Sequence, residues 1–277
     1  MKKKKTTRLI RLAVQIFFVL LISLFSLNHY RAEQGLEPIL VGEPSLHAVC
    51  PFGGVVTIYN YVTQGTFIKK IHASSWILMW IVLILALLFG PVFCGWMCPF
   101  GSVQEFLGKI GKKLFKKRYN HFIPAKIDPY LRYIRYIILG LVLYKTAVAG
   151  TLMFQERDPY FALFNFWSDE VTLAAFAILG VVLVGSLFVE RPWCKYACPY
   201  GALLGIFNLF RIVKISRNPN TCINCKRCDR VCPMNITPSD DTNVINHQCI
   251  ACLECTSEVE CPVADAMLLK IRPEVQL

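Results

Sequence analysis

Four long apolar segments, separated by polar and charged stretches, dominate the hydrophobicity pattern of the chain. A helix needs about 20 predominantly apolar residues to cross ~30 Å of hydrocarbon, and each segment comes close to that length. The pattern therefore predicts four transmembrane helices, at residues 9–27, 76–93, 136–154 and 171–189.

Two further stretches mix apolar and polar positions. Residues 101–119 interleave phenylalanine, leucine and isoleucine with lysines, as an amphipathic helix at a membrane surface does. Residues 201–213 repeat this character with less charge. We expect both to form helices on the membrane surface, the second one leading into the C-terminal region.

The composition agrees with a membrane protein, because 55% of the 277 residues are hydrophobic and only 17% are charged, with a mean hydropathy of +0.47. Residues 1–11 are basic, and the apolar run after them lacks a small-x-small cleavage site. This predicts a retained membrane anchor in place of a signal peptide. The cysteine pattern described below requires free thiolates and so indicates a reducing compartment.

Lysine and arginine are concentrated in the leader and in the loop between the second and third predicted spans. The other two loops balance a few basic residues with glutamate and aspartate. Basic loops stay in the cytoplasm, so both termini and the middle loop are expected there. The net charge of +12 reflects this topology. Because the basic residues flank membrane spans, we expect no nucleic-acid partner.

These signals predict a mainly α membrane protein: a four-helix transmembrane bundle of two parallel repeats, followed by a small C-terminal α+β ferredoxin domain with two [4Fe–4S] clusters. The first predicted repeat consists of a basic leader with the first span (1–27), an outer loop (28–75) and the second span with the first C-x3-C-P motif (76–101). A basic cytoplasmic loop (102–135) leads to the third span (136–154), an outer loop (155–170) and the fourth span with the second motif (171–201). An interfacial helix (202–215) and the ferredoxin domain (216–277) follow.

Eight cysteines near the C-terminus follow the spacing of two-cluster ferredoxins. The first run reads C-x2-C-x2-C-x3-C-P, and the second differs only in having five residues before its last cysteine. Three closely spaced thiolates bind one cluster, and the cysteine before proline ligates the other. Zinc knuckles use separated pairs instead. The spacing predicts cluster I on Cys222, Cys225, Cys228 and Cys261, and cluster II on Cys249, Cys252, Cys255 and Cys232.

Charged residues near the two runs have opposite signs. Basic residues surround the first run and acidic residues the second, and positive charge favours the reduced, more negative state of a cluster. The sequence therefore predicts that cluster I is the easier one to reduce. The residues concerned are Lys226, Arg227 and Arg230 for the first run, and Glu254, Glu258, Glu260 and Asp265 for the second.

The motif C-x3-C-P-aromatic-Gly occurs at residues 94–101 and again at residues 194–201. Each copy closes a pair of predicted spans, which indicates a parallel duplication about an axis along the membrane normal. The motifs should then lie side by side at the cytoplasmic mouth of the bundle. If the residues after Cys94 and Cys194 are helical, each cysteine pair lies on one face of a helix end. The thiols can hold an iron–sulfur or other metal centre, form two dithiol couples, or simply pack as small apolar groups. They are Cys94, Cys98, Cys194 and Cys198.

Three further residues are candidates for the route of the electron. Cys50 follows His47 in an outer Cys-Pro-aromatic sequence, and Asp158 begins an Asp-Pro-aromatic sequence in the other outer loop. Turns alone would explain the Pro and Gly residues equally well. Lys145 lies near the middle of the third predicted span, where a charge either faces the bundle interior or reaches the interface along its methylenes.

Together, the four spans, the two C-x3-C-P motifs and the ferredoxin cysteines resemble the NapH-type membrane iron–sulfur proteins and the related membrane region of NosR. The resemblance covers nearly the whole chain and is specific at the twelve cysteines of these motifs. It implies a multi-pass electron-transfer protein of the prokaryotic cytoplasmic membrane, of the kind that serves as a quinol dehydrogenase subunit. Such a protein relays electrons between clusters served by a cytoplasmic donor and a quinone or an extracytoplasmic flavoprotein or cytochrome.

A related group with the same C-x3-C-P motif handles copper for cytochrome oxidase assembly. The alternative function is therefore a metal-handling assembly factor, whose membrane thiols bind and reduce copper. A pair of methionines near the thiols would favour copper, because thioethers are soft ligands. Only Met97 is nearby, which favours the electron relay.

Overall fold

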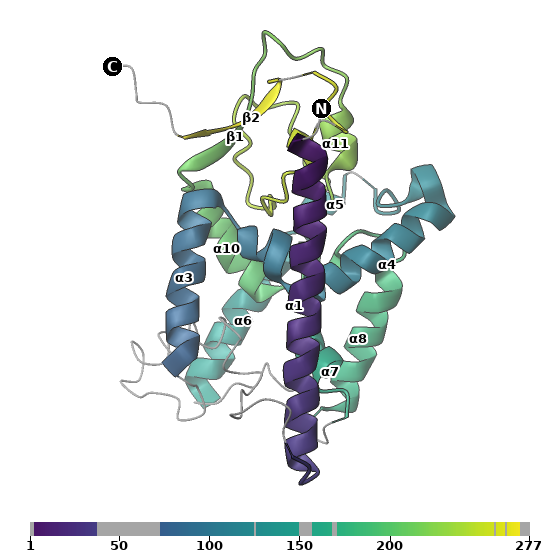
Figure 1. Cartoon of the computed structure of the whole chain (residues 1–277), viewed down its shortest axis with the longest axis vertical. Helices are drawn as coiled ribbons and strands as arrows, with labels where there is room; N and C mark the ends of the chain where they lie inside the picture. Colours follow the sequence, from purple (N-terminus) through teal and green to yellow (C-terminus); the bar gives the residue numbers. More distant parts are fainter. Residues whose placement is uncertain are drawn as a thin grey trace.

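The computed structural model describes residues 3–37, 73–124, 126–149, 157–167, 171–257, 259–263 and 265–271. It is mostly helical, and a small C-terminal region with two short strands caps one end of a group of elongated helices (Figure 1). The beginning of the first helix lies at the capped end. The fold thus agrees with the predicted division into a helical part and a small α+β part.

The helical part contains two repeats of the same order. The elements of the first are α1 (Lys3–Glu33), α3 (Ala73–Phe89), the π-helical turn η2 (Phe93–Met97) and α4 (Pro99–Phe115), followed by the short helices η3 (Lys116–Arg118) and α5 (Asp128–Leu131). Those of the second are α6 (Ile134–Ala149), α7 (Pro159–Phe164), α8 (Leu173–Gly185), α9 (Pro192–Tyr196) and α10 (Pro199–Leu209).

The helices that follow the C-x3-C-P motifs cross from one repeat to the other. Helix α4 packs against α1 and α8, whereas α10 packs against α3 and α6. Both helices run obliquely between the upright helices and the capping region (Figure 1). They cover the two stretches predicted as surface helices, beginning two residues earlier and ending about four residues earlier than predicted. The crossing brings the start of each helix to the boundary between the repeats.

Three of the four upright helices are shorter than the predicted spans, whereas α1, with 31 residues, is longer. Helix α1 contains one segment, Thr7–Arg31, that is long and apolar enough to cross a membrane; among the described residues no other helix meets both conditions. Helices α3, α6 and α8 have 17, 16 and 13 residues. Gly90 (φ +87°) and Pro91 stop α3 before the predicted end at Phe93, since neither residue favours a continuing helix. The described part of α6 ends at Ala149, before the predicted end at 154.

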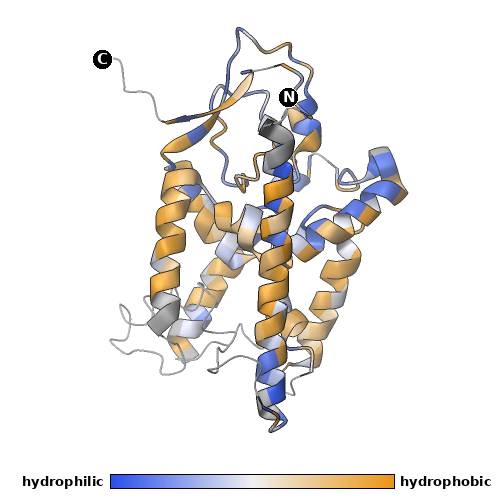
Figure 2. Ribbon diagram, viewed as in Figure 1, coloured by the Kyte–Doolittle hydropathy of each residue, from blue (hydrophilic) through white to orange (hydrophobic). Residues whose placement is uncertain are grey.

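Large apolar side chains cover the outward faces of all four upright helices. Figure 2 shows that hydrophobic residues make up much of α1, α3, α6 and α8. Examples are Phe17, Ile77, Ile137 and Val181, which are 58%, 65%, 62% and 73% exposed. Soluble proteins rarely expose apolar surface this continuously. The inner faces instead bury polar residues such as Arg11, Gln15 and Ser186.

The capping region holds the eight C-terminal cysteines. Its strands β1 (Val213–Arg217) and β2 (Met267–Ile271) pair antiparallel, with Ile215 opposite Leu269. The helices α11 (Arg227–Val231) and η5 (Glu254–Thr256) lie against each other. Ile215 and Met267 pack in one core with Cys228, Cys249 and Cys255. Cys232, Cys252 and Cys261 pack against this core, so six of the eight cysteines lie in it or against it.

Candidate iron–sulfur relay site

The two C-x3-C-P motifs adopt closely similar backbone conformations. Cys98 and Cys198 are extended, with φ/ψ of −63°/112° and −67°/113°, and the prolines after them begin α4 and α10. Proline is favoured at a helix start because the first N–H groups have no partner within the helix. The first cysteine of each motif lies in a separate preceding turn, η2 or α9. The two cysteines of each motif therefore belong to different elements, and the condition for placing them on one helix face is not met.

Backbone N–H groups at the N-termini of α4 and α10 point towards the motif thiols. The backbone N–H of Gly201 donates to Cys198 Sγ at 3.3 Å. The N–H groups of Phe100 and Gly101 interact with Cys98 in the same way. Burial raises the pKa of Cys98 and Cys198, and the helix N-terminus offsets part of this rise because it favours negative charge.

The crossing helices bring all four motif thiols together. Cys198 interacts electrostatically with the other three thiols, and Cys94 with Cys98 and Cys194. Cys94 and Cys198 pack against one apolar core, while Cys98 packs against the neighbouring one. All twelve described cysteines are free. Within the described residues, no three His, Cys, Asp or Glu side chains form a ready site for a single metal ion.

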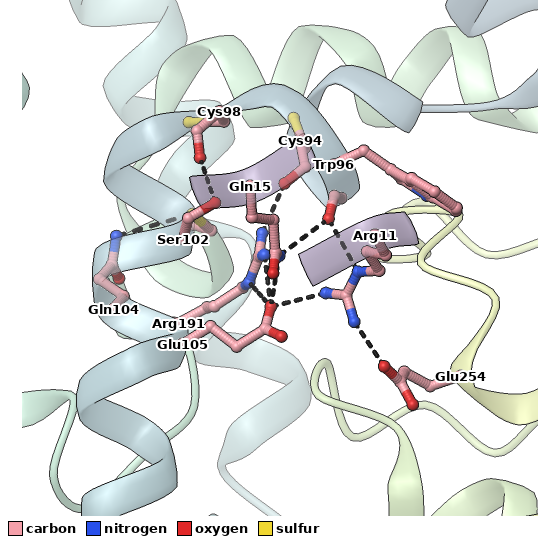
Figure 3. A network of polar contacts seen from close by, with 12 residues as sticks. Arg11, Gln15, Cys94, Trp96, Cys98, Ser102, Gln104, Glu105, Arg191 and Glu254 are labelled. Carbon is pink, nitrogen blue, oxygen red and sulfur yellow. Dashed lines mark hydrogen bonds and ion pairs between the residues drawn. The ribbon is translucent and has the colours of Figure 1, made fainter. Parts of the chain in front are cut away.

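A buried ion-pair network supports the first motif from below (Figure 3). One oxygen of Glu105 accepts from the guanidinium groups of Arg11 and Arg191, each at 2.6 Å. Gln15 donates to the same oxygen at 3.2 Å. The side chain of Arg191 is fully buried, and its Nη1 donates to the carbonyl oxygen of Cys94. Three segments far apart in the sequence thus fix the backbone at the first thiol.

The charges in this network keep Glu105 ionised. Burial alone would raise the pKa of Glu105, but the guanidinium groups of Arg191 and Arg11 outweigh it and lower the pKa. Glu190, which has no such pair, behaves in the opposite way: burial, and next the charge of Glu105, raise its pKa.

The first motif touches the capping region directly. The Nε1 of Trp96 donates to the carbonyl oxygen of Ala251 at 3.1 Å. Arg11 donates to the carbonyl oxygen of Gly95 at 3.1 Å and pairs with Glu254 at 2.6 Å. Cys94 also packs against the core that contains the second cysteine run. The thiol of Cys94 therefore lies next to the second cysteine run as well as among the motif thiols.

Gly95 makes this close approach possible. A Cβ atom at this position would lie 2.4 Å from the carbonyl oxygen of Ile250 and 3.4 Å from the Cα of Cys252. We expect Gly95→Ala to displace the capping region from the motif and to destabilise the protein by about 1–3 kcal/mol, as overpacking does. Thermal unfolding of the purified protein measures the effect.

Two other glycines provide matched controls for Gly95→Ala. A Cβ at Gly140 or Gly180 would meet no atom within 4 Å. Each alanine variant should be as stable as the native protein or more so, by up to about 1 kcal/mol, because alanine favours a helix. A Gly95→Ala variant as stable as these controls would contradict the tight contact.

Four cysteines of the capping region line one pocket. Its apolar walls include Ile215, Met234 and Ile250. Burial raises the pKa of Cys232 to about 12 and that of Cys252 to about 11, so ionisation there requires a compensating cation such as iron. The four thiols fit a [4Fe–4S] cluster and are the set predicted for cluster II: Cys232, Cys249, Cys252 and Cys255.

The two cysteine runs share an unusual backbone pattern. The residues on either side of the middle cysteine have positive φ in both runs: Asn224 and Lys226 beside Cys225, and Ala251 and Leu253 beside Cys252. Cys228 of the first run is buried in the core against which Cys261 packs. The repeated turn favours the first run as a second cluster site, with Cys222, Cys225, Cys228 and Cys261 as its ligands.

The three other residues predicted to mark the route of the electron lie in different surroundings. Asp158 caps α7 by accepting from the N–H of Tyr160 at 3.0 Å, and its charge reaches Cys98. Lys145 is exposed near the end of α6, so it does not face the bundle interior; the residues on the inner side of this turn are Val142 and Thr146. Cys50, with His47, lies outside the described residues.

Sequence reasoning missed the residues that join the two parts of the protein. Glu105 is the only acidic residue between positions 101 and 127, a signal that could have singled it out within the basic loop. Arg11 and Gln15 are four positions apart at the start of an apolar run, which places them on one helix face. Arg191 and Gly95 gave no comparable signal.

Family comparisons reproduce the internal repeat. A model described as a 4Fe-4S binding domain matches residues 71–118 and again 171–218, the same spacing as the two motifs. A model described as a 4Fe-4S dicluster domain matches residues 214–268, which include the C-terminal cysteines. These matches confirm that the chain has iron–sulfur binding domains in both parts.

Several characterised and uncharacterised proteins are similar to this chain. YccM of Escherichia coli (strain K12) is 29% identical over 97% of this chain and 75% of its own length. The ferredoxin-type protein NapH of Haemophilus influenzae is 32% identical over 63% of this chain and 61% of its own length. The regulatory protein NosR of Stutzerimonas stutzeri is 32% identical over 62% of this chain but only 24% of its own length.

No solved structure matches the chain. The matches to iron–sulfur domain families and to these relatives, with the convergence of the repeated cysteine motifs, agree on one assignment. The chain belongs to the NapH/NosR-type family of iron–sulfur electron-transport proteins.

Proposed function

We propose that this protein relays electrons between two [4Fe–4S] clusters in its capping region and a third redox centre held by the four motif thiols, and from there to a quinone or an extracytoplasmic redox partner. Bound clusters would supply one-electron chemistry. The observation that carries the proposal is the position of Cys94, which packs against both the capping core and the core of the upright helices.

A third [4Fe–4S] cluster is the centre that best suits the motif thiols. A cubane needs four thiolates, and each matched 4Fe-4S binding domain supplies only two motif cysteines. Each repeat contributes two thiols to the group of four that lie together. The negative charge of four thiolates would be offset in two ways. The N-termini of α4 and α10 point at Cys98 and Cys198, and the charges of Arg191 and Arg135 reach Cys94 and Cys194.

The membrane arrangement is part of the proposal. Helices α1, α3, α6 and α8 would cross the bilayer as predicted, with both termini and the capping region in the cytoplasm. The apolar outer faces of all four helices support this arrangement (Figure 2), as does the position of the basic N-terminus at the capped end (Figure 1). The shorter helices would need the adjoining segments to complete each crossing.

The route beyond the motif thiols would lead past α7. This helix packs between α1 and α8, and its residues share a core with Cys98. Asp158 at its start is the described residue that best marks this route. Cys50 stays a proposal for the corresponding position of the first repeat, whereas Lys145 is better explained as a residue that reaches the membrane interface.

Purified protein in sealed liposomes tests the proposed function. A reductant that cannot cross the membrane would be added on the side of the capping region, and an oxidised acceptor would be trapped inside. We expect the acceptor to be reduced only in liposomes that carry the cluster-loaded protein. Equal reduction in empty liposomes or with cluster-free protein would contradict a relay.

A further inference from the structure

A buried guanidinium group without a carboxylate partner lies beside the second cysteine run. Arg211 follows α10, and its side chain is only 1% exposed. Its Nη1 donates to Cys249 Sγ at 3.6 Å, and its Nη2 donates to the carbonyl oxygen of Val244. Among the described residues, its Nε has no acceptor and no carboxylate forms an ion pair with it.

Other buried arginines show what Arg211 lacks. Arg11 and Arg191 share Glu105, and Arg132 pairs with Asp128. Arg135 has no carboxylate partner among the described residues either, but it donates to the side chain of Gln248 and to the carbonyl oxygen of His247, not to a thiol. A buried charge is strongly unfavourable unless an opposite charge compensates it. The negative groups available to Arg211 are the thiolates of the pocket, because Cys249 is a ligand in the proposed cluster II set.

The fold makes room for this guanidinium group. A Cβ atom at Gly90 would lie 3.3 Å from both Cδ and Nη1 of Arg211 and 2.7 Å from Oδ1 of Asn208. Gly90 also has a φ of +87°, which favours glycine. Asn208 in turn donates to the carbonyl oxygen of Cys249 at 3.2 Å. The end of α3 and the end of α10 thus both hold Arg211 against Cys249.

The charges at the two cysteine runs differ from the sequence-based expectation. Glu254, counted there as a negative charge near the second run, is paired with Arg11 at 2.6 Å. The basic residues of the first run, Lys226, Arg227 and Arg230, are exposed, so solvent screens them. Among the described residues, the buried charge that donates directly to a thiol of either run is therefore Arg211, on the second run.

We propose that Arg211 is the counter-ion of cluster II and raises its reduction potential above that of cluster I. A nearby positive charge favours the reduced, more negative state, and its effect is larger where water is excluded. This order favours electron movement from the exposed first run towards the second run and the motif thiols. The inference rests on the proposed ligand sets, and it reverses the order expected from the sequence.

Redox titration of the intact, cluster-loaded protein, followed by electron paramagnetic resonance, tests this proposal. Arg211→Gln removes the charge and Arg211→Lys keeps it. In the glutamine variant we expect the equilibrium constant for reducing cluster II to fall about tenfold or more. A tenfold fall lowers the reduction potential by about 59 mV for a one-electron step, and the potential of cluster I should not change. The lysine variant should retain most of the native potential. A Cys222→Ser variant identifies the signal of cluster I.

Arg230 provides the matched control. It is exposed and donates to the carbonyl oxygen of Cys225 at 3.0 Å, so Arg230→Gln should shift the potential of cluster I far less than Arg211→Gln shifts that of cluster II. Equal potentials of cluster II in native protein and Arg211→Gln would overturn the proposal, as would a higher potential of cluster I in the native protein.

Cluster retention separates this proposal from other failures. Loss of cluster II from Arg211→Gln but not from Arg211→Lys would support a counter-ion. Loss from both variants would assign Arg211 a packing role and overturn the proposal. Native protein without iron–sulfur signals would instead refute the proposed function itself.

Discussion

Replacing both Cys94 and Cys194 with serine is expected to abolish electron transfer to an acceptor trapped in liposomes. The two substitutions remove half of the thiols at which the repeats meet, and serine does not replace a thiolate as an iron ligand in a stable cluster. The absorption of the C-terminal clusters should stay unchanged, because none of their eight predicted ligands is altered. Transfer rates and visible spectra of the same preparation measure both effects.

A serine introduced in the same turn provides the control. Ala197 lies between Cys194 and Cys198 at the end of α9, and Ala197→Ser adds a hydroxyl group without removing a thiol. It should transfer electrons at close to the native rate. Native rates in the double cysteine variant would show that the motif thiols only pack the structure.

Replacing Glu105 with glutamine is expected to destabilise the protein by about 3–5 kcal/mol, the typical cost of removing one partner of a buried ion pair. The substitution leaves the fully buried guanidinium of Arg191 without its carboxylate, while Arg11 keeps Glu254. Because Arg191 also holds the backbone of Cys94, the motif should loosen as well. Thermal unfolding of the purified protein measures the loss.

Glu190 provides a control of the same residue type at the neighbouring position to Arg191. Burial raises its pKa, so Glu190→Gln should change the stability of the protein little or not at all.

The pKa of Glu105 is instead lowered in the folded protein. Its stabilisation is therefore complete above the ordinary glutamate pKa of about 4.3 and is lost as the pH falls through the folded-state value. Equal stability of the two glutamine variants would refute the network.

The parts of the fold that depend on local spacing could be predicted from the sequence. The cysteine runs and the repeated motif each fit within a short stretch, whereas the prolines after Cys98 and Cys198 were compatible with a helix start or a break, and the structure shows helix starts. The helix ends were less predictable, because hydropathy continues past the glycine and proline that stop α3. Hydropathy measures the length of an apolar segment, whereas backbone conformation decides where its helix ends.

The contacts between distant segments could not be predicted. Arg11 and Glu254 are 243 positions apart, and each looked like part of a simple charge pattern when considered alone. Their pairing compensates one of the four acidic charges assigned to the second cysteine run, that of Glu254. Lys145 shows the same limit, because its depth in an apolar segment says nothing about which side of the helix the bundle covers.

Iron and acid-labile sulfide analysis under anaerobic conditions tests most directly whether the motif thiols hold a third cluster. Three [4Fe–4S] clusters predict about twelve irons and twelve sulfides per native chain, and about eight of each in the Cys94→Ser, Cys194→Ser variant. About eight of each in both proteins, or zinc without labile sulfide, would contradict the account.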